Sequence, residues 1–403
     1  MNQIAFILEH TTIYWHPIIL ALAIMSGICI FMACCHYSRI PEIWAAVIVV
    51  LGLILSLAFS RFLYWYSRPD SFESLLKAMT TPASGNFALV GAFAGCGITA
   101  LVVGKLSGKL RDLADCICVA GCGAIALGRL SNFFTSADRG QILTEMVSLP
   151  WAYPVMNPAS GMPDYRLATF MLQAIVAGVL FLVLCYLFFF GKKKFNIPQG
   201  DITFLFFTVY CTSQIILDST RYDSLYFRSN GFVSIVMVLS AVMLGVCIVT
   251  AAVRAVKAQG LQKWMIVFWI IIACLVGLAG YMEYYVQRHG KLAFFSYSIM
   301  EHCLVGIVVL TLWLWKVSLR KTESIYHSPH FRTPVSAAPE MHEIKIPSPN
   351  KTEMESVQAD TRETTSDKEN TLELELGEFN LQEFDLTDLA LEDPDLLKAF
   401  DYE

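Results

Sequence analysis

The sequence carries little charge for its length. Only 16% of its 403 residues are Asp, Glu, Lys or Arg, whereas about a quarter of the residues are charged in ordinary soluble proteins. Hydrophobic residues make up 56% of the chain and aromatic residues 13%. This composition excludes a soluble globular protein and predicts an all-α polytopic integral membrane protein.

Three other features are missing. The twelve cysteines form no disulfide framework, because all of them lie in or beside apolar segments, where a thiol behaves as a small hydrophobic side chain. No basic region precedes the first apolar segment, so we expect no cleavable signal peptide. Glu283, His289, Glu301 and His302 lack the regular spacing of a metal site carried on a helix. We therefore expect neither a metal nor another cofactor.

Nine apolar stretches are long enough to cross a hydrocarbon core of about 30 Å, which takes about 20 helical residues. They lie near residues 17–36, 43–66, 86–105, 115–134, 167–190, 201–219, 231–253, 264–283 and 300–317. The sequence therefore predicts about nine transmembrane helices. The stretch at 115–134 differs from the others because its end is polar.

Basic residues are concentrated in alternate loops. If the N-terminus lies outside, the clusters at 105–111, 192–194 and 254–263 all fall on the inner side. Because Lys and Arg are enriched in cytoplasmic loops, we expect the N-terminus outside and the C-terminus in the cytoplasm, in the cell (plasma or inner) membrane. The long loop at 135–166 then lies outside, and its prolines and aromatic residues predict a small ordered cap.

Acidic residues are concentrated in the last part of the chain. Residues 322–403 contain 20 acidic and 6 basic side chains, a net charge of −14, against −5 for the whole chain. We expect this tail to be disordered and cytoplasmic. Near its end, acids alternate with Leu and Phe, and two interpretations stay open: a solvated tail, or a segment that folds on a cytoplasmic partner.

The most informative stretch is GRLSNFFTSADRG, residues 128–140. It places Arg129 and Asn132 one helical turn apart at the end of an apolar segment. An arginine inside a membrane span costs about 3 kcal/mol on insertion scales and indicates a functional site. The alternative is an interfacial anchor whose guanidinium reaches the lipid headgroups.

A second stretch carries polar residues on one helical face. Tyr210, Gln214, Asp218 and Arg221 follow one another at spacings of four, four and three residues. Such spacings place side chains on the same side of a helix. Asp218 and Arg221 can pair there, which makes a buried charge tolerable.

Two further polar residues are expected at the same outer level. His16 begins the first span and Arg61 ends the second. Several arginines at headgroup depth suit a phosphate-bearing ligand, because a guanidinium binds phosphate oxygens in a two-pronged fork and stays protonated. The alternative is a set of interfacial anchors and ion pairs without a ligand.

These stretches resemble the prolipoprotein diacylglyceryl transferase family. GRLSNFFTSADRG is similar to its signature G-R-x-G-N-F-x-N-x-E-x-x-G, and YCTSQIILDSTR, residues 210–221, is similar to Y-G-x-x-R-F-x-x-E-x-x-R. Three looser blocks, IYWHPIILA, SRFLYWY and SGNFALVGAFAG, follow the family's order. The identical signature positions are Gly128, Arg129, Asn132, Phe133 and Gly140. The resemblance covers roughly residues 10–250.

The resemblance implies transfer of a diacylglyceryl group from phosphatidylglycerol to the lipobox cysteine of a pro-lipoprotein. It implies that Arg129 and Arg221 stabilise the departing phosphate and that Asn132 orients glycerol or ester oxygens. The expected catalytic residues are Arg129, Asn132, Arg221 and His16, and the expected phospholipid-binding residues are Arg61, Arg129, Gly140, Tyr210, Asp218 and Arg221. The transferase core is expected at 1–255, two additional helices at 256–320 and the tail at 321–403.

The chain also departs from the family pattern. Val90 stands where the family has a histidine, Ala137 where it has a glutamate, and Gln214 where it has an arginine. A cysteine thiol titrates near 8.5 and needs a base, and His16 is the local candidate. The alternatives are a non-catalytic relative that binds phospholipid or a lipobox peptide, and a transporter, although no repeated halves are evident.

Overall fold

The computed structural model describes residues 4–8, 11–80, 87–143, 152–156, 161–195, 197–228, 230–289 and 293–326. The chain divides into two units, Met1–Thr333 and Pro334–Glu403, and every described residue belongs to the first. Residues 327–403 lie outside the described residues, so the disorder and the cytoplasmic partner of the acidic tail stay predictions. Part of the cap at 135–166 also lies outside them.

The described residues include nine helices that are long and apolar enough to cross a membrane, which confirms the predicted number of spans. These are α1 (Trp15–Tyr37), α2 (Glu42–Ser67), α4 (Leu89–Leu106), α5 (Leu110–Leu130), α6 (Thr169–Tyr186), α8 (Asp201–Ser219), α9 (Ile235–Gln259), α10 (Lys263–His289) and α11 (Ala293–Tyr326). The turn η2 (Ser131–Phe134) extends α5, and a π-helical turn, η3 (Leu187–Gly191), extends α6. Short elements η1 (Pro69–Ser71), α3 (Leu75–Thr80) and α7 (Lys192–Lys194) lie between spans.

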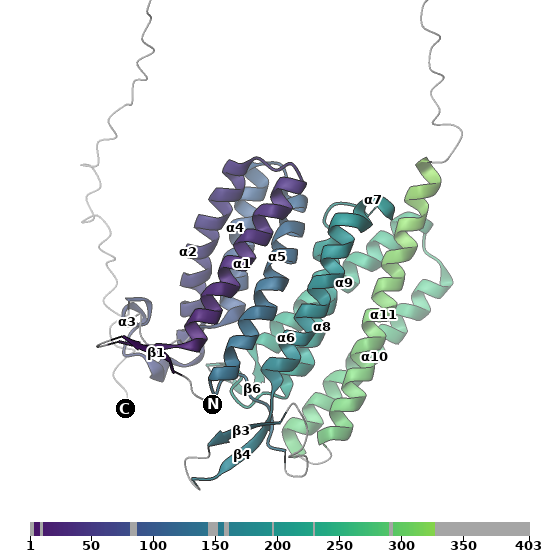
Figure 1. The fold of residues 1–403 in the computed structure, drawn as a ribbon. Coiled ribbons are helices and arrows are strands. Elements are labelled where there is room, and N and C mark those ends of the chain that lie inside the picture. The colour runs from purple at the N-terminus through teal and green to yellow at the C-terminus, as the bar shows by residue number, and fades with distance from the viewer. Residues whose placement is uncertain are drawn as a thin grey trace, which may run out of the picture. The chain divides into compact units, whose positions relative to one another are not determined.

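Three antiparallel hairpins accompany the helices. They pair β1 (Ile4–Leu8) with β2 (Thr11–Tyr14), β3 (Ala152–Met156) with β4 (Pro163–Leu167), and β5 (Tyr226–Phe227) with β6 (Asn230–Ser234). Figure 1 shows β1, β3, β4 and β6 at the same end of the bundle, the lower end in this view. The β3–β4 hairpin belongs to the loop at 135–166, where an ordered cap is predicted.

Helices α2 and α4 approach each other closely through glycine. A Cβ added at Gly95 would lie 2.5 Å from the Leu55 carbonyl carbon, so no larger residue fits there. The Ser56 and Ser60 hydroxyls donate to α4-side carbonyls at 2.9 and 2.8 Å. Small residues and hydroxyl bonds of this kind hold transmembrane helices together where no hydrophobic driving force exists between them.

Helix α5 packs against α1, α4, α6 and α8 and so lies inside the bundle. At its start, buried Asp115 pairs with Lys192 at 3.1 Å and accepts hydrogen bonds from the Thr203 N–H and hydroxyl, both at 2.9 Å. Asp201, which begins α8, pairs with Arg254 and accepts from the Trp315 indole at 2.7 Å. These bonds close the end opposite the hairpins.

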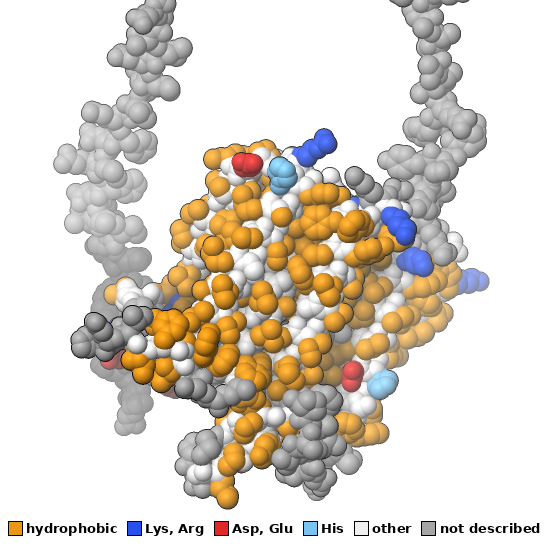
Figure 2. Space-filling model, in the orientation of Figure 1, with side chains coloured by type: hydrophobic (Ala, Val, Ile, Leu, Met, Phe, Trp, Pro, Cys, Tyr) orange, Lys and Arg blue, Asp and Glu red, His pale blue; other side chains and the backbone are white. Residues whose placement is uncertain are grey.

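The flank of the bundle is apolar. Figure 2 shows hydrophobic side chains across the helices, with Lys and Arg visible chiefly toward the end away from the hairpins. Exposed apolar residues of the spans include Leu57 of α2, Leu182 of α6 and Val249 of α9, at 58%, 67% and 61%. Such a surface is stable against hydrocarbon and not against water, so the protein is a multi-pass membrane protein.

Candidate functional site

The candidate site lies where α5 and α8 end, beside the β3–β4 hairpin. An isolated antiparallel β-bridge between Gly140 and Arg221 joins the loop after α5 to the loop after α8. The Gly140 N–H also donates to the Leu167 carbonyl at 2.7 Å. A Cβ at residue 140 would lie 2.6 Å from the Thr169 hydroxyl, so only glycine allows this approach. The predicted signature residue Gly140 therefore holds the two loops together.

Asp138 lies at the centre of the site. Its carboxylate pairs with Arg129 through one oxygen and with Arg221 through the other, the latter at 2.6 Å. The Asn132 amide also donates to it. The three charged side chains are nearly buried, with exposed fractions of 7% for Asp138, 13% for Arg129 and 11% for Arg221. The structure thus brings together the arginines of both predicted stretches around a carboxylate that sequence analysis did not single out.

Arg221 has two further carboxylate partners. Asp218 and Asp223 each lie 3.1 Å from its guanidinium, which confirms the predicted pair with Asp218. The Ser234 hydroxyl holds Asp218 from the opposite side, and Asp223 accepts the Asp138 N–H at 2.9 Å. Three carboxylates, Asp138, Asp218 and Asp223, therefore surround Arg129 and Arg221 and form the Asp138 cluster with them.

Attraction between opposite charges keeps the buried acid and arginine side chains of the Asp138 cluster ionised. Burial by itself would raise the pKa of Asp138, but the positive charges of Arg129 and Arg221 outweigh it and hold that pKa below its ordinary value. Burial would likewise lower the pKa of Arg221, and Asp138 and Asp218 raise it instead. The carboxylate and the guanidinium are therefore both ionised at neutral pH.

The carboxylate is supplied by a left-handed residue. Asp138 has φ +55°, a conformation that short polar residues tolerate better than branched ones. The preceding residue, Ala137, is exposed. The acid that the resemblance places at position 137 is thus absent there, and the next residue carries a carboxylate into the site. Val90 is half-buried in the first turn of α4.

Arg139 fixes the conformation of the loop that ends the GRLSNFFTSADRG stretch. Its side chain is fully buried, with the guanidinium 3.9 Å from the centre of the Tyr153 ring and 4.2 Å from that of Phe170. It donates to the Asn132 and Thr135 carbonyls at 2.9 and 2.5 Å. Burial lowers the pKa of this arginine. It connects β3 and α6 to η2 and so fixes the loop that presents Asp138.

The predicted face of α8 is buried along its length. Tyr210, Gln214 and Asp218 are exposed by only 5%, 4% and 1%, and the Tyr210 hydroxyl hydrogen-bonds to Arg129. The Gln173 amide of α6 donates to Gln214 at 3.3 Å. Within the described residues, the Gln173 carbonyl oxygen and the Thr169 hydroxyl are buried without a partner. Polar groups therefore continue from the Asp138 cluster into the bundle, and some are free to bind a ligand.

His16 and Arg61 lie on the first two spans. His16 is in the first turn of α1, where the neighbouring Trp15 ring stacks on Phe134 of η2 at 6.0 Å. Its Nδ1 is buried and makes no hydrogen bond within the described residues. The Arg61 guanidinium is buried near the Phe72 and Phe87 rings, at 5.4 and 4.6 Å from their centres. His16 is thus beside the signature turn, and Arg61 is packed against aromatic rings at the end of α2.

The last two helices also reach the site. Glu283 of α10 accepts the Ser219 hydroxyl at 2.6 Å, next to Asp218. The Tyr297 hydroxyl of α11 donates to the Ser219 carbonyl at 3.2 Å and accepts from Gln141 at 2.9 Å. Tyr297 therefore ties the two site loops together from outside. Nothing in the sequence pattern of α10 or α11 indicated this, because both segments are apolar on most faces.

Comparison with known proteins agrees with this geometry. Residues 3–253 match the family model of prolipoprotein diacylglyceryl transferase. The chain is 27% identical over 251 residues to the phosphatidylglycerol–prolipoprotein diacylglyceryl transferase of Shouchella clausii (strain KSM-K16), covering 58% of this chain and 85% of that protein. It is 22% identical over 273 residues to the enzyme of the same name from Bacillus cereus (strain B4264), covering 66% and 96%. The match runs from before α1 into α9 and includes the whole Asp138 cluster, so the chain belongs to the prolipoprotein diacylglyceryl transferase family.

Proposed function

We propose that this protein transfers the diacylglyceryl group of phosphatidylglycerol to the lipobox cysteine of pro-lipoproteins, at the outer face of the cell membrane. The observation that carries the proposal is the meeting of Arg129 and Arg221 at one end of the bundle. The names of the related proteins describe this activity. A pair of ionised guanidinium groups at headgroup depth suits a phosphate.

The reaction replaces one bond at a glycerol carbon. The cysteine sulfur forms a bond to that carbon, the carbon–oxygen bond to the phosphate breaks, and glycerol phosphate leaves with the electron pair. Negative charge therefore grows on the phosphate in the transition state, where fixed cations stabilise it. Arg129 and Arg221 take this role, and Asn132 orients glycerol or ester oxygens.

To bind the two arginines, the lipid phosphate must displace part of the Asp138 carboxylate from them. Both guanidinium groups are already paired with Asp138, so the headgroup replaces part of that pairing. The Arg129 Nε is buried without a partner in the described part of the chain and offers a free donor. Tyr210, Asp218 and Gly140 keep the arginines in position, and Arg61 contributes positive charge at the end of α2.

The thiol proton needs an acceptor. Val90 and Ala137 cannot accept one, and an arginine is too weak a base at neutral pH. We assign this role to His16, whose Nδ1 has no partner and whose helix contacts the signature turn. Imidazole is the side chain best suited to proton transfer near neutral pH.

The proposed orientation places the N-terminus outside and the C-terminus in the cytoplasm. The candidate site then faces the outer surface, where pro-lipoproteins emerge. The opposite end carries Lys192, Arg254 and the basic loop at 105–111. Positive charge on the cytoplasmic side supports this orientation.

Transfer of labelled phosphatidylglycerol to a lipobox peptide by the purified protein tests the proposal. We expect Arg129→Ala to reduce transfer at least a hundredfold, the usual scale for removing a fixed charge-stabilising donor. His16→Ala should reduce it tenfold or more, and Arg228→Ala is the control because Arg228 is exposed at the same end. Full activity in Arg129→Ala would overturn the assignment.

A second candidate is a relative that binds the phospholipid without transferring it, which the half-buried Val90 in place of a basic residue favours. Phosphatidylglycerol retained in an Arg129-dependent way, with no transfer by the wild-type protein, would establish that function. A transporter would instead move a solute across vesicles independently of a lipobox peptide.

A further inference from the structure

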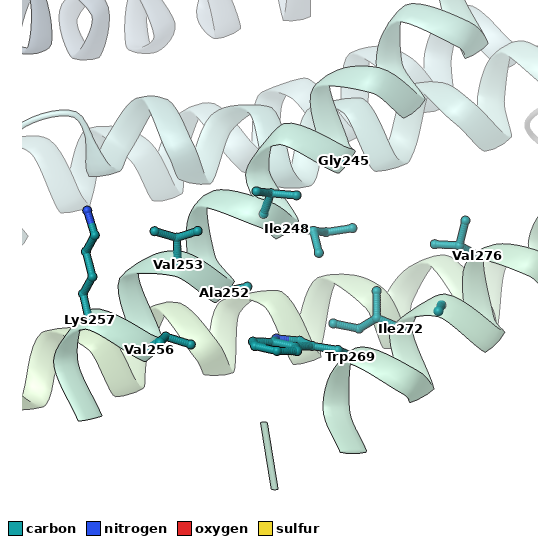
Figure 3. Close-up of a pocket in the computed structure, with 11 residues that line it drawn as sticks. Gly245, Ile248, Ala252, Val253, Val256, Lys257, Trp269, Ile272 and Val276 are labelled. Atoms are coloured by element: carbon teal, nitrogen blue, oxygen red, sulfur yellow. The ribbon is translucent and has the colours of Figure 1, made fainter. Parts of the chain in front are cut away.

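Helices α9 and α10 follow one another in the chain but barely contact each other. Helix α11 packs against both of them. The space left between α9 and α10 is an open groove of about 770 Å³. Its walls are Gly245, Ile248, Val249, Ala252, Val253, Val256 and Lys257 of α9 and Trp269, Ile272, Ala273 and Val276 of α10. Figure 3 shows the labelled residues along the two helices, with Lys257 at the end of the α9 row away from Gly245 and with Trp269, Ile272 and Val276 on α10.

The groove has the length of one leaflet. From Gly245 to Lys257 the α9 axis rises by about 18 Å, at 1.5 Å per residue. Half of a hydrocarbon core measures about 15 Å. The apolar part therefore runs from near the middle of the membrane to the end of α9 that lies opposite the candidate site. A single acyl chain of that leaflet fits this length.

The positive charge of Lys257 lies at one end of the groove. Within the described residues no carboxylate pairs with Lys257, whereas the neighbouring Arg254 pairs with Asp201. Lys257 is exposed in the last turn of α9, where a cation lies at headgroup level. An apolar groove closed by one unpaired cation is complementary to a lipid with an anionic headgroup.

Trp269 lines the groove with a hydrogen-bond donor that needs an acceptor. Its indole N–H is buried and has no acceptor within the described residues. A buried hydrogen-bond donor without an acceptor costs free energy. Indole rings favour the level of the membrane at which acyl chains meet the headgroup. The ester carbonyl of a diacyl lipid lies at that level and can accept this hydrogen bond.

We propose that the groove between α9 and α10 binds one anionic diacyl phospholipid from the leaflet opposite the candidate site. The phosphate pairs with Lys257, and an acyl chain lies along the valines of α9. One wall of this groove is α10, which follows the matched family region ending at residue 253. The binding site is therefore separate in place from the transferase site, and its α10 wall lies outside the family match.

Brominated lipids test the proposal through Trp269. The protein is reconstituted in phosphatidylcholine vesicles that contain equal fractions of brominated phosphatidylglycerol or brominated phosphatidylcholine. Subtracting the signal of Trp269→Phe isolates the quenching of Trp269 from that of the other tryptophans. One surface cation contributes about 1 kcal/mol, so we expect about a fivefold preference for phosphatidylglycerol over phosphatidylcholine.

Lys257→Gln is expected to remove this preference, whereas Lys105→Gln keeps it. Lys105 is a matched control, because it is exposed in the last turn of α4 and does not line the groove. Gly245→Leu should fill the groove, because a Cβ there meets no atom within 4 Å. It should reduce quenching by both lipids.

Three results would overturn the proposal. Equal quenching by both lipids would mean that only bulk lipid reaches the groove. Quenching by neither lipid would mean that protein covers it. If Trp269→Phe does not fold, native mass spectrometry of the wild type and Lys257→Gln replaces the fluorescence difference, and equal retention of phosphatidylglycerol by both would also refute the site.

Discussion

Replacing Asp138 with asparagine removes the shared carboxylate from between Arg129 and Arg221 and keeps the size of the side chain. Removing one partner of a buried ion pair costs about 3–5 kcal/mol, because the remaining charge stays buried. Arg221 retains Asp218 and Asp223, each at 3.1 Å. The loss therefore falls mainly on Arg129, whose ion pairs within the described residues include only Asp138. We expect a cost of about 3 kcal/mol.

Scanning fluorimetry of the detergent-solubilised protein measures this cost. A change of 1 kcal/mol shifts the midpoint by about 2–4 °C in domains of 150–250 residues. At pH 7 the Asp138→Asn midpoint should fall by at least about 5 °C. Asp70→Asn is the control, because Asp70 is exposed in η1, and its midpoint should change by less than about 1 °C.

The pH dependence of the midpoint difference between wild type and Asp138→Asn shows whether the lost ion pair causes it. The pKa of Asp138 is lowered in the folded protein, so its contribution is complete above the ordinary aspartate value of about 3.9 and is lost as the pH falls through the folded-state pKa. The difference between wild type and Asp138→Asn should be constant from pH 7 to 5 and shrink below about pH 4. An unchanged midpoint at pH 7, or a difference that disappears between pH 8 and 6, would refute this reasoning.

Two other substitutions address the frame of the site. Gly140→Ala places a Cβ 2.6 Å from the Thr169 hydroxyl and should lower stability by about 1–3 kcal/mol in the same assay; Gly121→Ala, where the Cβ meets nothing within 4 Å, should not, and equal midpoints for the two variants would contradict the packing argument. Tyr297→Phe removes two hydrogen bonds at the site loops and should reduce kcat of transfer about 2–10-fold with KM for phosphatidylglycerol unchanged. Tyr281→Phe, on an exposed position of α10, is its control, and a loss of kcat in both variants would mean that Tyr297 has no special role.

The spans could be predicted because a membrane constrains them strongly. A helix that crosses hydrocarbon needs a minimum length and few charges, and both are visible in sequence. Thus the predicted segment 201–219 coincides with α8, and 43–66 differs from α2 by one residue at each end. The first and last residues elsewhere differ more, as for 300–317 within α11, because polar residues continue a helix beyond the hydrocarbon.

The arginines of the site could also be predicted, because a charge in an apolar segment is conspicuous. Asp138 was missed for a different reason. It lies in a loop, one residue beyond the position where the family has its glutamate, and neither its φ of +55° nor its pairing with Arg129 is visible in sequence spacing. Gln173 and Tyr297 were missed because a single polar residue in an apolar helix has no partner that sequence spacing can reveal.

The three carboxylates around Arg129 and Arg221 have a consequence for selectivity. The site already contains its own anions, so a small free anion such as inorganic phosphate gains little by entering, since it must displace carboxylates that are already paired with the arginines. A ligand that also anchors two acyl chains in the surrounding membrane brings additional free energy and can win this competition. Under the function proposed above, we therefore expect the Asp138 cluster to select a phosphate carried by a lipid over free inorganic phosphate.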